Sequence, residues 1–182
     1  KGIKLITEKF AKLPCQFVFL GTGQKEYENH LLKLAKKYPS QFSAQIKFDE
    51  ELAHLIYAGS DIFLMPSLFE PCGLGQMIAM RYGTVPVVRA TGGLADTVKS
   101  LTTDNRQLTT KNATGFIFKK FNSSSLYKIL EDALRVYYNY PKVWRQTQIN
   151  GMKKDFSWNK SAKEYLKLYR KALTKTKIFA KI

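Results

Sequence analysis

Residues 67–76 carry the side chains best suited to chemistry, in the order Ser-Leu-Phe-Glu-Pro-Cys-Gly-Leu-Gly-Gln. Glu70 follows an apolar run, and Pro71 and Gly73 favour a turn before the next helix. A helix that begins near Gly73 presents free N–H groups and the positive end of its dipole, and both favour anions. This arrangement suits a sugar phosphate, because the helix can hold the phosphate while Glu70 accepts hydrogen bonds from sugar hydroxyls. The same residues also fit a carboxylate that only caps the helix, and the local sequence leaves both interpretations open.

Two further glycine turns follow apolar runs. Residues 21–23 (Gly-Thr-Gly) fit either a phosphate-binding turn or a simple tight turn between a strand and a helix. The dinucleotide fingerprint needs a third glycine or alanine where Glu26 stands, so a nicotinamide or flavin cofactor is not expected. Residues 91–93 (Thr-Gly-Gly) open another helix, whose N–H groups could meet an anion or a sugar oxygen.

Two other polar side chains lie next to these turns. Cys72 stands at a helix start, and we interpret it as a backbone-contact position rather than a nucleophile. Arg89 could reach the mouth of a pocket or form a structural ion pair. No grouping of serine, histidine and aspartate or of cysteine and histidine stands out at these turns, and no metal site is expected.

The elements that must position these residues alternate along the chain. Apolar runs predict strands at 16–20, 44–48, 61–65, 85–88 and 115–118. Helical spacing predicts helices at 25–38, after Asp49, and at 73–82, 94–98, 123–140, 141–154 and from 158. This alternation predicts an α/β fold, a Rossmann-like parallel sheet with helices on both faces, whose ligands bind at the carboxyl ends of the strands. Residues 102–113 are expected to form an exposed loop, and 175–182 a frayed end. A first helix is expected almost at residue 1, so the sheet is expected to lack its first strand.

The composition narrows the function classes. The chain has 182 residues, 45% of them hydrophobic, which fits one domain or one domain plus a tail. No apolar run is long enough to span a membrane, and the two cysteines fit a reducing, cytoplasmic setting. Thirty basic residues against fourteen acidic ones give a net charge of +16. The excess is dominated by lysine, whereas base recognition favours arginine, so specific nucleic-acid binding is not expected.

The motifs around Glu70 strongly resemble starch and bacterial glycogen synthases, the retaining glucosyltransferases of family 5. The resemblance rests on Phe-Glu-Pro-Cys-Gly-Leu at 69–74, Ala-Met-Arg-Tyr-Gly-Thr-Val-Pro at 79–86 and Arg-Ala-Thr-Gly-Gly-Leu at 89–94. It extends to residues 20–28 and 155–165 and covers nearly the whole chain. It implies the C-terminal half of a two-domain GT-B enzyme, with a nucleotide-sugar-binding domain at 1–157 and a helix and tail at 158–182 that cross back to the N-terminal domain.

The same resemblance implies roles for particular residues. Glu70 corresponds to the glutamate that contacts the donor glucose, and Lys1 to the lysine that neutralises the diphosphate leaving group. Phe48 stands where the family often has a tyrosine against adenine, Gly75 replaces a usual threonine, and Lys47 stands where glycine is frequent. The implied catalytic residues are Lys1 and Glu70, the implied donor sugar- and phosphate-binding residues are Cys72, Gly73, Leu74 and Gly75, and the implied nucleotide-binding residues are Gly21, Gly23, Lys47 and Phe48.

The resemblance implies that glucose passes from ADP-glucose, or UDP-glucose, to the non-reducing end of an α-1,4-glucan, with no cofactor. Lys1 and the helix terminus would stabilise the departing diphosphate, and Glu70 would orient the glucose. The acceptor and further catalytic groups belong to the N-terminal domain, so this chain alone is expected to transfer no glucose. The alternatives are a non-catalytic glucan- or nucleotide-binding module and a retaining transferase that uses another nucleotide sugar.

Overall fold

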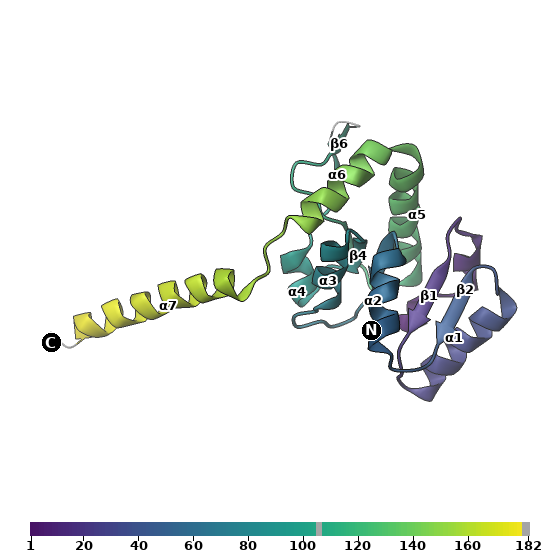
Figure 1. Ribbon diagram of the computed structural model, residues 1–182, viewed down its shortest axis with the longest axis horizontal. Coiled ribbons are helices and arrows are strands. Elements are labelled where there is room, and N and C mark those ends of the chain that lie inside the picture. Colours follow the sequence, from purple (N-terminus) through teal and green to yellow (C-terminus); the bar gives the residue numbers. More distant parts are fainter. Residues whose placement is uncertain (105–106, 180–182) are drawn as a thin grey trace.

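The computed structural model describes residues 1–104 and 107–179 (Figure 1). Two short 3-10 helices open the chain, and β-strands then alternate with α-helices as far as Thr97; strands and then helices follow, and the last helix is long. Within the described residues, no helix combines the length and apolar character needed to cross a membrane.

The strands form two separate parallel sheets and a small hairpin. β1 (Phe17–Leu20) pairs with β2 (Phe42–Gln45), and the second sheet has the order β3 (Ile62–Met65), β4 (Val85–Arg89) and β7 (Phe116–Phe118). β5 (Thr102–Asp104) and β6 (Gln107–Thr109) pair with each other in antiparallel fashion. The fold class expected from the sequence, an α/β Rossmann-like fold with parallel strands and helices on both faces, is confirmed.

Side-chain caps account for the starts of two helices. Asp49 accepts a hydrogen bond from the Leu52 amide at 2.9 Å, and Asn122 accepts one from the Ser125 amide at 2.8 Å, so each caps the helix that follows it. The helices are η1 (Ile3–Leu5), η2 (Glu8–Lys12), α1 (Lys25–Lys37), α2 (Glu50–Gly59), α3 (Gly75–Tyr82), α4 (Gly92–Thr97), α5 (Ser123–Asn139), α6 (Pro141–Met152) and α7 (Trp158–Phe179).

The core consists of two apolar clusters. The larger one packs η1, η2, α1 and α5 against strands of both sheets, with Phe10 and Leu126 fully buried. The smaller one packs α3 and α4 against β4 through Met80, Leu94 and Val88. Val85 and Val87 of β4 belong to the larger cluster and Val88 to the smaller one, so the two clusters cover opposite faces of β4.

Four local expectations need correction. The strand expected at 44–48 lies at Phe42–Gln45, because the Phe42 ring stacks on Phe17 with centroids 5.0 Å apart. The loop expected at 102–113 contains the β5–β6 hairpin, and residues 105–106 of that loop lie outside the described residues. The start of the chain is two 3-10 helices rather than one helix. The end expected to fray continues as helix α7 to Phe179, and 180–182 lie outside the described residues.

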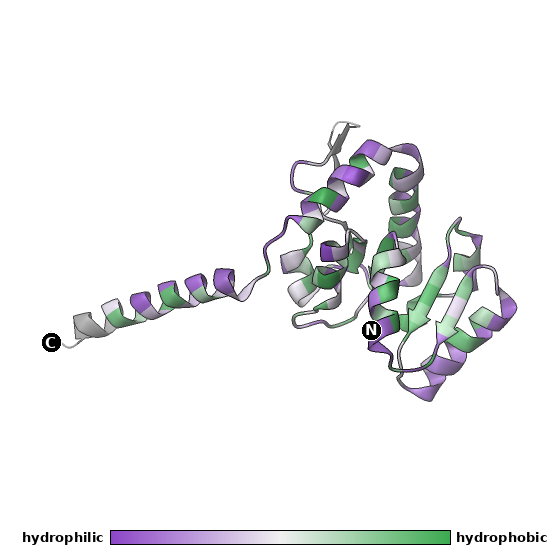
Figure 2. Cartoon of the chain, in the orientation of Figure 1, coloured by the Kyte–Doolittle hydropathy of each residue, from purple (hydrophilic) through white to green (hydrophobic). Residues whose placement is uncertain are grey.

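Helix α7 projects away from the rest of the molecule (Figure 1). Apolar and polar residues alternate along it, in contrast to the apolar strands and the inner side of α5 (Figure 2). Large apolar side chains of α7 are exposed, namely Trp158, Tyr165, Leu166, Leu168, Tyr169 and Leu173.

Candidate functional site

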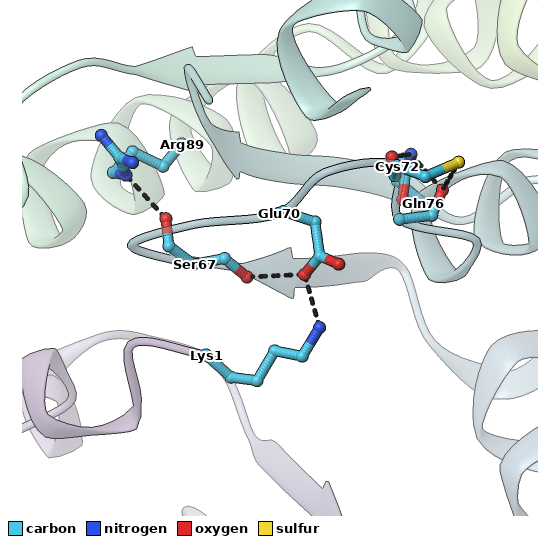
Figure 3. A network of polar contacts seen from close by, with 7 residues as sticks. Lys1, Ser67, Glu70, Cys72, Gln76 and Arg89 are labelled. Atoms are coloured by element: carbon cyan, nitrogen blue, oxygen red, sulfur yellow. Dashed lines mark hydrogen bonds and ion pairs between the residues drawn. The ribbon is translucent and has the colours of Figure 1, made fainter. Parts of the chain in front are cut away.

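The centre of the candidate site is a carboxylate that follows the carboxyl end of β3. Glu70 is buried, with 7% of its surface exposed, in the loop that joins β3 to α3. Lys1 Nζ lies 2.5 Å from Glu70 Oε2, and the Ser67 hydroxyl donates to the same oxygen at 3.1 Å (Figure 3). The structure therefore brings together the two residues expected to be catalytic, although 69 positions separate them.

These contacts fix the charge of the carboxylate. The hydrogen bond from the Lys1 ammonium holds the pKa of Glu70 below its usual value, and burial opposes this only in part. Glu70 is therefore ionised at neutral pH. Both hydrogen bonds go to Oε2, so among the described residues Oε1 keeps capacity to accept a hydrogen bond from a ligand hydroxyl.

Gln76 holds the turn between Glu70 and α3. Its side-chain amide donates to the carbonyls of Gly73 at 2.7 Å and Cys72 at 3.3 Å, and to the Thr97 hydroxyl at 3.0 Å. Gln76 is completely buried, and its Oε1 has no partner among the described residues. Gly73 has a φ of +73°, and a Cβ there would lie 2.6 Å from Gln76 Oε1, so both the conformation and the space require glycine.

The start of α4 forms backbone hydrogen bonds to the same turn. The Gly93 amide is shared between the carbonyls of Glu70 and Pro71, both at 3.2 Å. A Cβ on Gly93 would overlap the Cys72 backbone. This amide therefore holds the loop rather than a ligand, contrary to the hypothesis that it stays free for an anion or a sugar oxygen.

Arg89 also supports the loop rather than a ligand. Its Nε donates to the Ser67 carbonyl at 2.6 Å, another guanidinium N–H donates to the Leu68 carbonyl, and the guanidinium lies over the Phe121 ring. The two options raised by the sequence, a reach to the pocket mouth or an ion pair, are replaced by backbone hydrogen bonds.

The turn at residues 21–23 already holds a carboxylate. The Gly23 amide donates to Glu28 Oε1 at 3.0 Å, and Lys25 pairs with the other oxygen of Glu28 at 2.8 Å. Both contacts lower the pKa of Glu28. No described atom lies within 4 Å of a Cβ built on Gly21 or Gly23, so open space borders both glycines.

One cavity of about 1460 Å³ connects most of the expected site residues. Its lining includes Lys1, Gly21, Gly23, Glu70, Gly73, Leu74 and Gly75. Three expected residues lie outside this lining. Lys47 pairs with Asp49 at 2.7 Å, Phe48 lies next to it with 88% of its surface exposed, and Cys72 is exposed at the loop surface.

Ser67 and Gln76 belong to the segment 67–76 and Glu28 to the motif at 20–28, but the sequence predicted no role for any of the three. Gln76 left one signal, an amide side chain on the apolar face of a predicted helix, directly after the turn. Ser67 and Glu28 left none, because a hydroxyl after a strand and a carboxylate in the first turn of a helix are common on protein surfaces.

Parallel strands that alternate with helices on both faces of the sheet agree with the GT-B glycosyltransferase fold. The family model for "Glycosyl transferases group 1" matches residues 1–150, and the chain belongs to this family.

Relatives with about 50% sequence identity specify the kind of glycosyltransferase that this chain resembles. The glycogen synthase of Thermotoga maritima is 52% identical over 178 residues, and that of Kosmotoga olearia is 49% identical over 176 residues. The matches cover 96% and 95% of this chain but 36% of each relative, so the chain spans about a third of their length.

Solved structures agree with this assignment. The catalytic domain of starch synthase IV from Arabidopsis thaliana, bound to ADP and acarbose, is 36% identical with a TM-score of 0.80, over 96% of this chain and 36% of that one. Sucrose-phosphate synthase from Thermosynechococcus elongatus, at 23% identity and a TM-score of 0.68 over 96% and 43%, shares the fold. The resemblance to starch and bacterial glycogen synthases is confirmed.

Proposed function

We propose that this chain is the donor-binding domain of a retaining glucosyltransferase, which transfers glucose from ADP-glucose to the non-reducing end of an α-1,4-glucan. The observation that carries the proposal is the buried Glu70 carboxylate, paired with Lys1 beside the start of α3. The names of the glycogen synthase relatives support the glucan acceptor. ADP bound to the starch synthase supports adenine rather than uracil in the donor.

Lys1 and Glu70 exchange partners in the proposed reaction. In this structure the Lys1 ammonium pairs with Glu70, and 69% of the Lys1 side chain is exposed to solvent. The donor diphosphate offers Lys1 a stronger negative partner, and Glu70 Oε1 then accepts hydrogen bonds from glucose hydroxyls. As the diphosphate leaves, Lys1 stabilises the charge that develops on it, while Glu70 holds the sugar in place.

The turn after Glu70 supplies the remaining donor contacts. The backbone of Cys72, Gly73, Leu74 and Gly75 lies against the glucose and the distal phosphate in this proposal, and Gln76 keeps that backbone in place. The amide groups at the start of α3 add positive potential toward the phosphate.

The nucleotide occupies the open space next to Gly21 and Gly23. The Gly23 amide already donates a hydrogen bond to Glu28. In this proposal the two glycines therefore let the nucleotide approach the backbone closely, and they do not bind its phosphates. The exposed Phe48 ring offers a flat apolar face for adenine, and Lys47 lies beside it.

The exposed apolar side chains of helix α7 favour contact with a partner domain. These side chains and the projection of α7 from the molecule suit docking on the N-terminal domain of the same enzyme (Figure 1). We therefore propose that residues 1–157 form the donor domain and that 158–182 cross to that partner. The cytoplasmic location expected from the cysteine content stays a prediction.

Titration of the isotope-labelled chain with ADP-glucose and UDP-glucose, followed by NMR, tests the proposal. We expect shifts near Gly21, Phe48, Glu70 and Gly73, and tighter binding of ADP-glucose. Glu70→Gln should weaken binding, whereas Glu131→Gln on the exposed side of α5 should not. Shifts confined to other regions, or equal effects of the two variants, would contradict the proposed site.

An elongation assay separates the proposed enzyme domain from a non-catalytic module. The chain alone should add no glucose to glycogen, because the acceptor groups are expected on the N-terminal domain. A longer protein that contains this chain and an N-terminal domain should elongate glycogen, and Glu70→Gln should reduce its rate. A longer protein that binds ADP-glucose and glycogen without any transfer would indicate a binding module instead.

A further inference from the structure

The hydroxyl of Tyr57 belongs to a side chain that lines the cavity of the candidate site. Tyr57 lies in the last turn of α2, which packs against α3, and its side chain is half-buried. The same cavity is lined by Lys1 and Glu70. Within the described part of the chain, the Tyr57 hydroxyl forms no hydrogen bond. Polar groups in closed sites are normally paired, so a hydroxyl without a protein partner is open to a ligand.

This hydroxyl lies at the start of α3. A Cβ built on Gly75, the first residue of α3, would lie 3.2 Å from the Tyr57 hydroxyl oxygen. The same Cβ would lie 2.9 Å from each of two ring atoms of Phe63 on β3. The Tyr57 hydroxyl and the Phe63 ring therefore occupy the space that a side chain at position 75 would fill. The first turn of α3 is flanked by these two aromatic side chains and has no side chain of its own at this point.

Packing holds the Tyr57 ring in place. Its centroid lies 5.1 Å from that of Phe63, and it stacks on Tyr82 with centroids 6.1 Å apart and planes 13° apart. The Thr84 hydroxyl donates to the Tyr57 carbonyl at 2.5 Å, which fixes the backbone at the end of α2. A ring that is already fixed loses little conformational entropy when its hydroxyl binds a ligand, so this group is preorganised for binding.

The chemistry of this position favours an anionic acceptor. Burial raises the pKa of Tyr57 above its ordinary value, so the hydroxyl keeps its proton at neutral pH and can donate it in a hydrogen bond. The first amides of α3 and the positive end of its dipole favour negative charge at the same place. In a nucleotide sugar, the diphosphate is the part that carries charged acceptor oxygens. The Tyr57 hydroxyl therefore suits the diphosphate better than the sugar or the base.

We propose that the Tyr57 hydroxyl donates a hydrogen bond to the diphosphate of the bound nucleotide sugar. Tyr57 is then a donor-binding residue supplied by α2, an element that carries none of the residues expected at the site. Because Gly75 has no side chain, nothing at that position separates the hydroxyl from a phosphate at the start of α3. The inference rests on the proposed donor site and adds one residue to it.

Replacement of Tyr57 by phenylalanine tests the inference, because it removes the hydroxyl oxygen and keeps the ring that packs on Phe63. NMR titration of the isotope-labelled chain gives the affinities for ADP and for adenosine, which lacks the diphosphate. Tyr57→Phe should weaken ADP binding about tenfold, the effect of losing one hydrogen bond to a charged group. It should leave adenosine binding unchanged, because the proposed contact is made only to the diphosphate.

Tyr82→Phe is the matched control. Tyr82 stacks on Tyr57 in the same aromatic cluster, and its hydroxyl pairs with His54 Nδ1 at 2.9 Å. Among the described residues that line the cavity, Tyr82 is absent. Its replacement removes a hydroxyl from the cluster without removing one from the site, so ADP affinity should stay within about twofold of the parent. Urea unfolding of both variants shows whether either change alters the fold.

The possible results separate this inference from the proposed function. If Tyr57→Phe binds ADP as tightly as the parent chain, the inference is overturned while the donor site stands. If the variant loses affinity for ADP and adenosine equally, Tyr57 only supports the fold of the site, and the inference is again overturned. If the parent chain binds neither ADP nor ADP-glucose, the proposed function and the inference fail together.

Discussion

Replacement of Gln76 by leucine tests whether a single buried amide holds the site loop. Gln76→Leu keeps approximately the same size but removes hydrogen bonds to the Gly73 carbonyl at 2.7 Å, the Thr97 hydroxyl at 3.0 Å and the Cys72 carbonyl at 3.3 Å. Thr97 keeps its own hydrogen bond to the Gly93 carbonyl at 2.6 Å, and Cys72 is exposed enough for water to replace its lost partner.

The expected cost follows from these contacts. A buried polar group that loses its partner costs about 1–3 kcal/mol, and the Gly73 carbonyl is the group most affected. Gln76 Oε1 is itself buried without a partner, so its removal offsets part of that cost. We therefore expect Gln76→Leu to lower the free energy of unfolding by about 2 kcal/mol.

Urea unfolding followed by tryptophan fluorescence measures this change. Gln146→Leu is the matched control, because Gln146 is exposed on α6 and its side chain donates to Asn150, and it should change stability by less than about 0.5 kcal/mol. Affinity for ADP-glucose should fall for Gln76→Leu and not for the control. A Gln76→Leu protein as stable as the control would refute the role assigned to this amide.

Four further predictions follow from the same region. Lys1 lowers the pKa of Glu70, so the stability that the ionised carboxylate adds is complete above pH 4.5 and is lost as the pH falls through the lower folded pKa. The difference in unfolding free energy between the parent and Glu70→Gln should therefore shrink from pH 7 to pH 3. A difference that stays constant over this range would contradict the pairing of Lys1 with Glu70. Gly93→Ala should lower the unfolding free energy in urea by about 1–3 kcal/mol, because its Cβ meets the Cys72 backbone, and an unchanged midpoint would oppose this packing. Gly23→Ala should leave stability within about 0.5 kcal/mol of the parent but weaken ADP-glucose binding in calorimetry, since its Cβ enters only open space; unchanged affinity would move the nucleotide elsewhere. Partial burial raises the pKa of the Cys15 thiol to about 11, so iodoacetamide at pH 8 should modify the exposed Cys72 first. Mass spectrometry of the peptides would show this order, and equal labelling would contradict the raised pKa of Cys15.

Local sequence patterns predicted the elements with strong signals. The apolar run that became β4 is buried in the interior of its sheet, where continuous apolar character is required. The Asp49 cap and the proline at the start of α6 were predictable because these residues act on backbone groups within one helical turn. The placement of Glu70 after β3 followed from the same local pattern.

The predictions of a strand at 44–48 and of a loop at 102–113 were wrong for two different reasons. Ile46 and Phe48 made the later residues look like the strand, but the aromatic stacking of Phe42 on Phe17 sets the position of β2. The β5–β6 hairpin has little apolar content, so its pairing left no periodic signal in the sequence.

The sequence alone determined the fold class, the family and the identity of the glutamate at the end of β3, because these depend on short-range patterns and on motifs. Tertiary structure alone decided how the groups around that glutamate are used. In the folded chain Lys1 pairs with Glu70, and the Gly23 amide donates to Glu28. The Gly93 amide donates to carbonyls of the Glu70 loop, and the Gln76 side chain donates to the Gly73 carbonyl in the same loop. Each of these contacts depends on the directions in which separate strands and helices approach, and a hydrogen bond forms only within a few tenths of an ångström and a narrow angle.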